Sequence, residues 1–129
     1  MIRRRRDGLL SGRTRPLLMH LTTADISLEL LIGPQLSAFS AAGYEVVGVS
    51  APGPFVEKVR ARGIEHVALG NATRSMNLGA DLAALGELVR LFRERRPDIV
   101  HTHNPKTGVY GRIAARIADV PVVLNTVHG

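Results

Sequence analysis

The 129-residue sequence contains no cysteine and no tryptophan, and only 4% of its residues are aromatic. Without cysteine there can be no disulfide bond and no zinc or iron–sulfur site built on thiolates. No apolar run reaches the roughly 20 residues that a transmembrane helix needs, and no apolar h-region of a signal peptide follows the N-terminal arginines. These absences fit a protein of a reducing compartment, so we expect a cytoplasmic location.

The positive charge is concentrated at the N-terminus. The net charge is +6, and six arginines with one aspartate in the first 16 residues account for +5 of it. We expect residues 1–15 to form a basic, disordered extension. Contact of Arg3, Arg4, Arg5 and Arg6 with anionic lipid at the inner membrane face is the alternative. Nucleic acid is not expected as a partner, because no aromatic residues alternate with these arginines to stack on bases.

From Pro16 onward, short apolar runs alternate with amphipathic segments. The pattern predicts strands at residues 17–21, 45–50, 64–69, 99–102 and 120–127, separated by helices within residues 28–42, 55–62, 77–96 and 106–118. Pro34 removes a backbone donor, so the first helix should be kinked or begin late. The sequence therefore predicts one α/β domain over residues 16–129: a Rossmann-like open parallel sheet of about five strands with helices on both faces.

The lengths of the connections indicate the order of the strands. The connection between the third and fourth strands, residues 70–97, is twice as long as the one over residues 50–63. A longer connection allows the chain to cross the first strand, which predicts the order 3-2-1-4-5; a flavodoxin-like order is the alternative. The loops at residues 22–27 and 103–106 would then line one crevice at the carboxyl edge, where open α/β sheets bind ligands.

Several kinds of site have no support in the sequence. There is no G-x-G-x-x-G after the first strand and no G-x-x-x-x-G-K-[ST], so neither a dinucleotide fingerprint nor a P-loop is present. The strand ends carry Thr22, Ser50, His103 and His128 rather than acidic residues. The run His101-Thr102-His103 lacks a neighbouring carboxylate and the geometry for two ligands, so we expect no metal site.

The last third of the sequence carries a specific resemblance. Residues 96–103, the segment 108–118 with Gly111 and Arg112, and residues 120–123 and 126–129 resemble the N-terminal half of a GT-B glycosyltransferase of family 4. Residues 42–46, Ala-Gly-Tyr-Glu-Val, add to the likeness, which extends over residues 16–129. The resemblance implies the acceptor-side half of the GT-B architecture, without the C-terminal domain that binds the donor.

The resemblance also implies an activity. Family members are retaining transferases that move a sugar from a nucleotide-diphosphate sugar to a cell-envelope or polysaccharide acceptor, either a glycan or a lipid-linked one. No cofactor and no metal ion are expected. The 129-residue chain alone should be inactive. The alternatives are a nucleotide-sugar 2-epimerase of the same architecture and a non-catalytic binding module.

Six site residues follow from the resemblance. His128 is the candidate catalytic residue near the donor sugar, with Thr126 beside it in the Thr-x-His pattern. His103, Asn104 and Lys106 match the loop that commonly faces the acceptor. Thr23 lies where many members have a Gly-Gly pair near the donor phosphate. Each has a purely structural alternative: a histidine at a strand end, a turn at Asn104, and a solvated lysine in a first helical turn.

The fifth strand, residues 120–127, is apolar on both faces, as in a parallel strand covered by helices. Nothing in this sequence follows Gly129 to cover it. We therefore expect Val122, Val123, Leu124 and Val127 to be incompletely covered, and the chain to self-associate through this strand.

Overall fold

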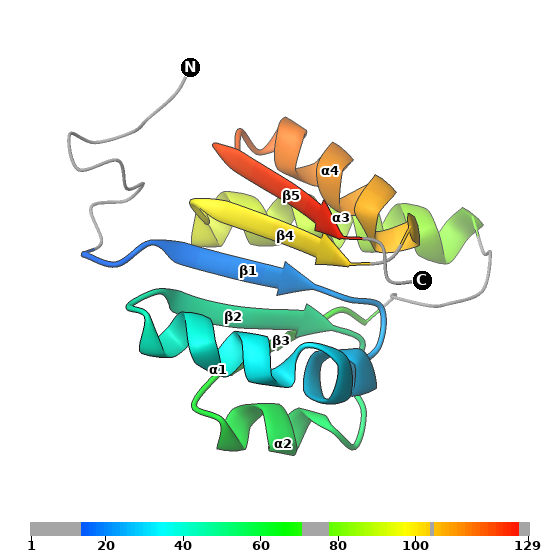
Figure 1. The fold of residues 1–129 in the computed structure, drawn as a ribbon. Coiled ribbons are helices and arrows are strands. Elements are labelled where there is room, and N and C mark those ends of the chain that lie inside the picture. Colours follow the sequence, from blue (N-terminus) through cyan, green and yellow to red (C-terminus); the bar gives the residue numbers. More distant parts are fainter. Residues whose placement is uncertain (1–13, 71–77, 104, 127–129) are drawn as a thin grey trace.

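The computed structural model describes residues 14–70, 78–103 and 105–126, which form a five-stranded parallel sheet with helices on both faces (Figure 1). The strands are β1 (Leu17–Leu21), β2 (Glu45–Ser50), β3 (Glu65–Ala68), β4 (Ile99–His103) and β5 (Val122–Thr126). The helices are the π-helical turn η2 (Ser27–Leu31), α1 (Gly33–Ala41), α2 (Val56–Ala61), α3 (Leu78–Arg95) and α4 (Pro105–Ile117). The predicted Rossmann-like α/β class is confirmed. Residues 1–13 of the expected basic extension lie outside the described residues.

The strand order is β3-β2-β1-β4-β5, and every neighbouring pair is parallel. This is the predicted order, so the flavodoxin-like alternative is wrong. β1 pairs with β2 on one side and with β4 on the other, and the direction of winding reverses there. The carboxyl ends of β1 and β4 therefore border the switch point of the sheet, where a ligand crevice is expected.

Each face of the sheet has its own apolar core. On one face, Met19, Val47 and Val100 pack with Phe92 of α3 and Ala114 of α4. The other face has a separate cluster of six buried aliphatic residues from η2, α1, α2 and their neighbours: Leu28, Ile32, Leu36, Val46, Val59 and Ile64. Because side chains alternate along a strand, residues of one parity face α3 and α4 and the others face α1.

Helix α4 lies close against the sheet because it presents glycine there. A Cβ atom on Gly111 would collide with the Thr102 side chain and would come within 2.9 Å of Leu21 Cδ2. One turn earlier, a Cβ atom on Gly108 would lie 2.5 Å from Asn125 Oδ1. The two glycines thus set the position of α4, and with it the loop that joins β4 to the helix.

The first helix begins late, as Pro34 predicts. A π-helical turn, η2, precedes α1, and Pro34 occupies the first turn of α1, where a missing backbone donor costs little. This change of helical pitch turns Leu31 outward, and its side chain is 47% exposed although the apolar spacing predicts burial. Arg62 Nε donates to both carboxylate oxygens of the buried Glu29, at 2.8 and 3.0 Å, and so ties η2 to the end of α2.

One part of the sheet has no helix over it among the described residues. On the face shared with α1, Val122 is 39% exposed and Leu124 is 50% exposed. Val123 points to the other face and packs against the α3 and α4 core. Val127, also predicted to be uncovered, lies outside the described residues. None of the described helices is long and apolar enough to span a bilayer.

Candidate functional site

Three of the predicted site residues lie at the carboxyl edge of the sheet. His103 is the last residue of β4 and Thr126 the last of β5, and the two are register partners. Thr23 follows β1, the other neighbour of β4, and its carbonyl accepts a hydrogen bond from the Ala51 amide at 3.0 Å. The topology therefore brings three of the six predicted residues to one edge.

The other three residues are only partly described. Lys106 lies in the first turn of α4, and nothing is described of its side chain. Asn104 and His128 lie outside the described residues. Lys106 lies at the N-terminus of α4, where the helix dipole favours an anion. The first turn of α4 contains no acidic residue.

The loop after β1 is held to the loop after β2. Asp25 is buried, and its carboxylate accepts a hydrogen bond from the Phe55 amide at 2.6 Å. The Thr22 hydroxyl is also buried and donates to the Ala24 carbonyl at 2.8 Å. The Asp25 bond ties the two loops together, and the Thr22 bond holds the loop after β1 within itself.

The main feature that the sequence analysis missed is a buried group of three histidines, which we call the histidine cluster: His20, His101 and His103. His20 and His101 are register partners on β1 and β4, and His103 lies two residues further along β4. All three rings therefore lie on the face of the sheet that α1 covers. Their exposed fractions are 0, 9 and 1%. The expectation that His101 and His103 lack the geometry to act together is wrong, because β4 continues through His103 and keeps both rings on one face.

The rings of the cluster are in direct contact. His20 Nδ1 lies 3.0 Å from His103 Nε2, so one of these nitrogens carries a hydrogen that the other accepts. The ring centroids of His101 and His103 are 4.3 Å apart. His101 Nε2 lies 2.7 Å from Thr126 Oγ1, which joins β5 to the cluster. Thr126 and His103 thus belong to one polar network at the ends of β4 and β5.

Burial determines the charge of this network. Loss of solvation, with smaller contributions from His103 and His101, lowers the pKa of His20 from 6.5 to about 3. His20 is therefore neutral at pH 7. Its Nε2 atom is buried and has no hydrogen-bond partner among the described residues. His103 is enclosed at the end of its strand, so any direct contact with a ligand would require this end of the crevice to open.

A second histidine contact lies at the ends of β2 and β3. His66 Nε2 is 2.8 Å from Ser50 Oγ, and both residues are buried. Burial is the main reason that the pKa of His66 is lowered, and the charge of Arg60 adds to the effect. The Ser50 hydroxyl donates to the Ala51 carbonyl at 2.8 Å, so its hydrogen is engaged and the pair has a structural role.

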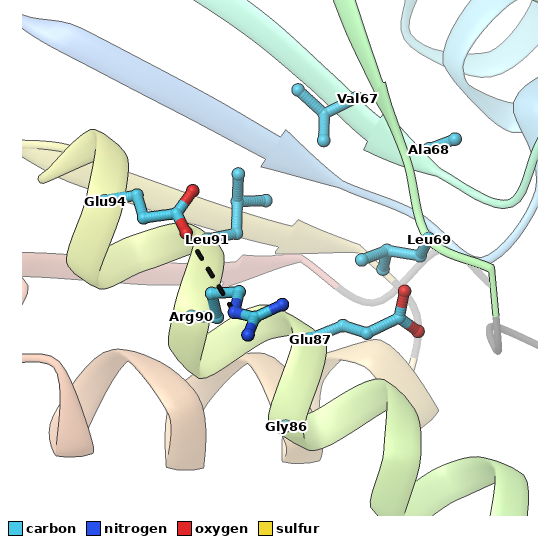
Figure 2. A pocket seen from close by; sticks show the side chains of 8 residues that line it. All are labelled: Val67, Ala68, Leu69, Gly86, Glu87, Arg90, Leu91 and Glu94. Carbon is cyan, nitrogen blue, oxygen red and sulfur yellow. Dashed lines mark ion pairs between the residues drawn. The ribbon is translucent and has the colours of Figure 1, made fainter.

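A hollow of about 400 Å³ lies between the edge strand β3 and helix α3 (Figure 2). Val67 and Leu69 form its apolar wall, and Glu87 and Arg90 line the helical side. Glu87 Oε2 accepts a hydrogen bond from the Gly70 amide at 3.1 Å. This hollow is at the opposite edge of the sheet from β5, so it is separate from the predicted crevice.

The described residues form a Rossmann-like domain whose switch point lies between β1 and β4. The family model described as "Glycosyl transferase 4-like domain" matches residues 32–129. The chain belongs to this family.

Two curated relatives are glycosyltransferases. The chain is 52% identical, over 56 residues, to the Escherichia coli UDP-Gal:alpha-D-GlcNAc-diphosphoundecaprenol alpha-1,3-galactosyltransferase; the match covers 43% of this chain and 14% of that protein. It is 32% identical, over 112 residues, to the Staphylococcus aureus capsular polysaccharide biosynthesis glycosyltransferase CapM; the match covers 87% of this chain and 28% of CapM. The chain thus spans less than a third of the length of either relative.

Solved structures share the fold. A glycosyltransferase from Rickettsia africae superposes with a TM-score of 0.69 at 16% identity, over 88% of this chain and 30% of that one. A UDP-N-acetylglucosamine 2-epimerase superposes with a TM-score of 0.62 at 17% identity, over 84% of this chain and 32% of that one. The shared fold does not separate transferase from epimerase, whereas both curated relatives are transferases.

Proposed function

We propose that this chain is the acceptor-side half of a retaining glycosyltransferase. The complete enzyme would move a sugar from a nucleotide-diphosphate sugar to a glycan or lipid-linked acceptor of the cell envelope, at the cytoplasmic side of the membrane. The observation that carries the proposal is the family match over residues 32–129, on a sheet whose switch point lies between β1 and β4. The epimerase alternative has no support beyond the shared fold.

The roles that we propose for the site residues come from the resemblance to the family. Thr126, and His128 two residues later, would face the donor sugar, where an imidazole can hydrogen-bond a hydroxyl or offset diphosphate charge. Thr23 would contact substrate from the loop after β1. Asn104 would face the acceptor, and His103, buried beside His20, would contact it after this end of β4 opens. We propose that the transfer itself requires no metal ion and no bound cofactor.

The proposed acceptor is a sugar linked through diphosphate to a polyprenol, the class named for the E. coli relative. Lys106 and the first backbone amides of α4, at the end of β4, would receive the diphosphate. The positive end of the helix dipole and the lysine act in the same direction on an anion there. The basic N-terminal residues Arg3, Arg4, Arg5 and Arg6 would add attraction to anionic lipid, about 1 kcal/mol for each residue near the surface.

A domain exchange tests the proposed function. Residues 16–129 would replace the corresponding N-terminal domain of the E. coli galactosyltransferase, and transfer of galactose from UDP-galactose to GlcNAc-diphosphoundecaprenol would be measured. The chimera should be active and the 129-residue chain alone inactive. Orientation of two substrates between two domains contributes up to about 7 to 11 kcal/mol, and one domain cannot supply it.

Two outcomes would contradict the proposal. Transfer by the isolated chain at rates typical of the family would show that no second domain is needed. A folded but inactive chimera, with a donor domain that still binds UDP-galactose, would show that this chain does not serve as an acceptor-side half. If the chain still bound the acceptor, that second result would favour the non-catalytic binding module.

A further proposal concerns the open face of β5. Val122 and Leu124 are apolar and exposed at the edge strand of the sheet, so we propose that the isolated chain associates with a second copy there. Sedimentation velocity should show species larger than the monomer. The double variant Val122→Thr, Leu124→Thr should shift the population to monomer, whereas Leu82→Thr, at an exposed leucine of α3, should not. A wild-type chain that stays monomeric over the concentration range would refute the proposal.

A further inference from the structure

The histidine cluster has the composition of a transition-metal site. His20, His101 and His103 each offer one imidazole nitrogen, and these three atoms all lie within 4.8 Å of one another. Imidazole is a ligand of choice for Zn²⁺, Cu²⁺ and Ni²⁺. Sites with three histidines and one open position bind zinc in known enzymes. No carboxylate takes part in the group found here.

The spacing of the rings is close to that of three imidazoles on one ion. The three ring-centroid distances are 4.3, 5.1 and 5.3 Å. Three imidazoles on one Zn²⁺, with bonds of about 2.0 to 2.1 Å and angles of about 90 to 109°, place their ring centres about 4.5 to 5.2 Å apart. His20 Nδ1 and His103 Nε2, 3.0 Å apart, already have the separation of two ligands on one ion, and the His101 nitrogen, within 4.8 Å of both ligand atoms, would move closer by rotation of its side chain.

The metal-free network does not satisfy all of its buried polar atoms. His20 is fully buried, and its Nε2 atom has no hydrogen-bond partner among the described residues. Burying polar groups without full compensation costs free energy. Coordination would satisfy His20 Nδ1 and His103 Nε2 with one ion, whereas His20 Nε2 would carry the ring hydrogen and keep no partner among the described residues. The ion would take the place of the hydrogen shared by His20 Nδ1 and His103 Nε2, with a change of tautomer in one ring.

The surroundings provide a fourth position and a route of entry. Thr126 Oγ1 lies 2.7 Å from His101 Nε2, so its hydroxyl, or a water molecule beside it, is close to the open position. His101 is the most exposed member of the cluster, and its register partner Leu124 is half exposed. The side of β5, where no described helix covers the sheet, is the route that we propose for entry of an ion.

We propose that His20, His101 and His103 bind one transition-metal ion, Zn²⁺ in the first place, through one imidazole nitrogen each. The ion joins β1 to β4 across the switch point and stiffens the sheet below the crevice. It does not take part in sugar transfer, and the proposal does not rest on the proposed function.

The test uses the 129-residue chain without a histidine tag, stripped of metal with a chelator. Calorimetric titration with Zn²⁺ should show one ion per chain, and Co²⁺ should give the visible absorption bands of a low-coordinate imidazole site. Added Zn²⁺ should raise the thermal midpoint. Loss of one ligand in His101→Ala should weaken binding by at least about 100-fold, since even outer-shell changes cost 10 to 100-fold. The variant His101→Gln, which keeps a polar side chain, provides a second test should the alanine variant fold poorly.

The matched control is His66→Ala, which removes a buried histidine of the same sheet outside the cluster. It should bind Zn²⁺ like the wild type, and so should His128→Ala. The proposal is overturned if the wild-type chain binds no Zn²⁺ or Co²⁺. It is equally overturned if the cluster variants bind normally while His66→Ala or His128→Ala loses binding.

Discussion

In the active chimera, replacing His128 with alanine should lower kcat by about 10² to 10³-fold, the usual cost of removing one group that stabilises charge in the transition state. The expectation rests on the resemblance of Thr126-Val127-His128 to the family's Thr-x-His pattern, since His128 lies outside the described residues. Steady-state kinetics with saturating UDP-galactose would measure the effect. Circular dichroism should show an unchanged fold.

Two further variants serve as controls for His128→Ala. His66→Ala, at a histidine on β3 with two strands between it and β4, should leave kcat unchanged. His103→Ala should mainly raise the KM for the acceptor, and its folding must be checked because it removes the partner of His20 Nδ1. An unchanged kcat in His128→Ala would leave that residue a purely structural role. An effect of His103→Ala on kcat alone would indicate that the loop after β4 faces the donor and the segment after β5 faces the acceptor, the reverse of our proposal.

Acid should destabilise the metal-free chain over an unusually wide range of pH. His20 has a pKa of about 3 in the folded chain, against 6.5 for an ordinary histidine, because it is buried beside His103 and His101. Below about pH 6.5 the unfolded chain binds a proton at this residue and the folded chain does not. Stability is therefore complete above pH 6.5 and is lost as the pH falls, by up to about 1.4 kcal/mol per pH unit.

By pH 3.5 this single residue should lower the free energy of unfolding by about 4 kcal/mol, a large share of the 5 to 15 kcal/mol typical of a domain. The lowered pKa of His66 acts in the same direction. Urea denaturation between pH 7.5 and 4, with a chelator present, would measure the slope. In the variant His20→Leu, the slope of the free energy of unfolding against pH should be smaller by the contribution of about one bound proton. The variant His66→Leu should change this slope less. Equal slopes in wild type and His20→Leu would contradict the assignment.

Much of the fold could be predicted because local signals and global topology agree. The apolar runs of β1, β2 and β4 are buried on both faces, so they are continuous and bounded by polar turns. Pro34 predicts the late start of α1, and the length of residues 70–97 predicts the crossing from β3 to β4. Leu82 is the counterexample. It fits the apolar stripe of α3 by spacing, but it is 57% exposed, because the packing angle of a helix is not encoded in its spacing.

Less of the site could be predicted, because it depends on contacts between distant residues. His20 interrupts an apolar strand, which is an informative sign, but its partner is 83 residues away. Only the register of β1 against β4 shows that His20 lies beside His101. Periodicity places a side chain on a face, whereas register decides which side chains meet. The roles of all six predicted site residues stay predictions.

The contact between Asp25 and Gly53 has a consequence for how the sequence can change. Any side chain at position 53 would place its Cβ atom in collision with the Asp25 carboxylate, which accepts the hydrogen bond from the Phe55 amide. Substitution of Gly53 is therefore tolerable only where position 25 has already lost its carboxylate or turned away. Across relatives that keep this loop, the two positions should vary together, so that a residue larger than glycine at 53 coincides with a small or uncharged residue at 25.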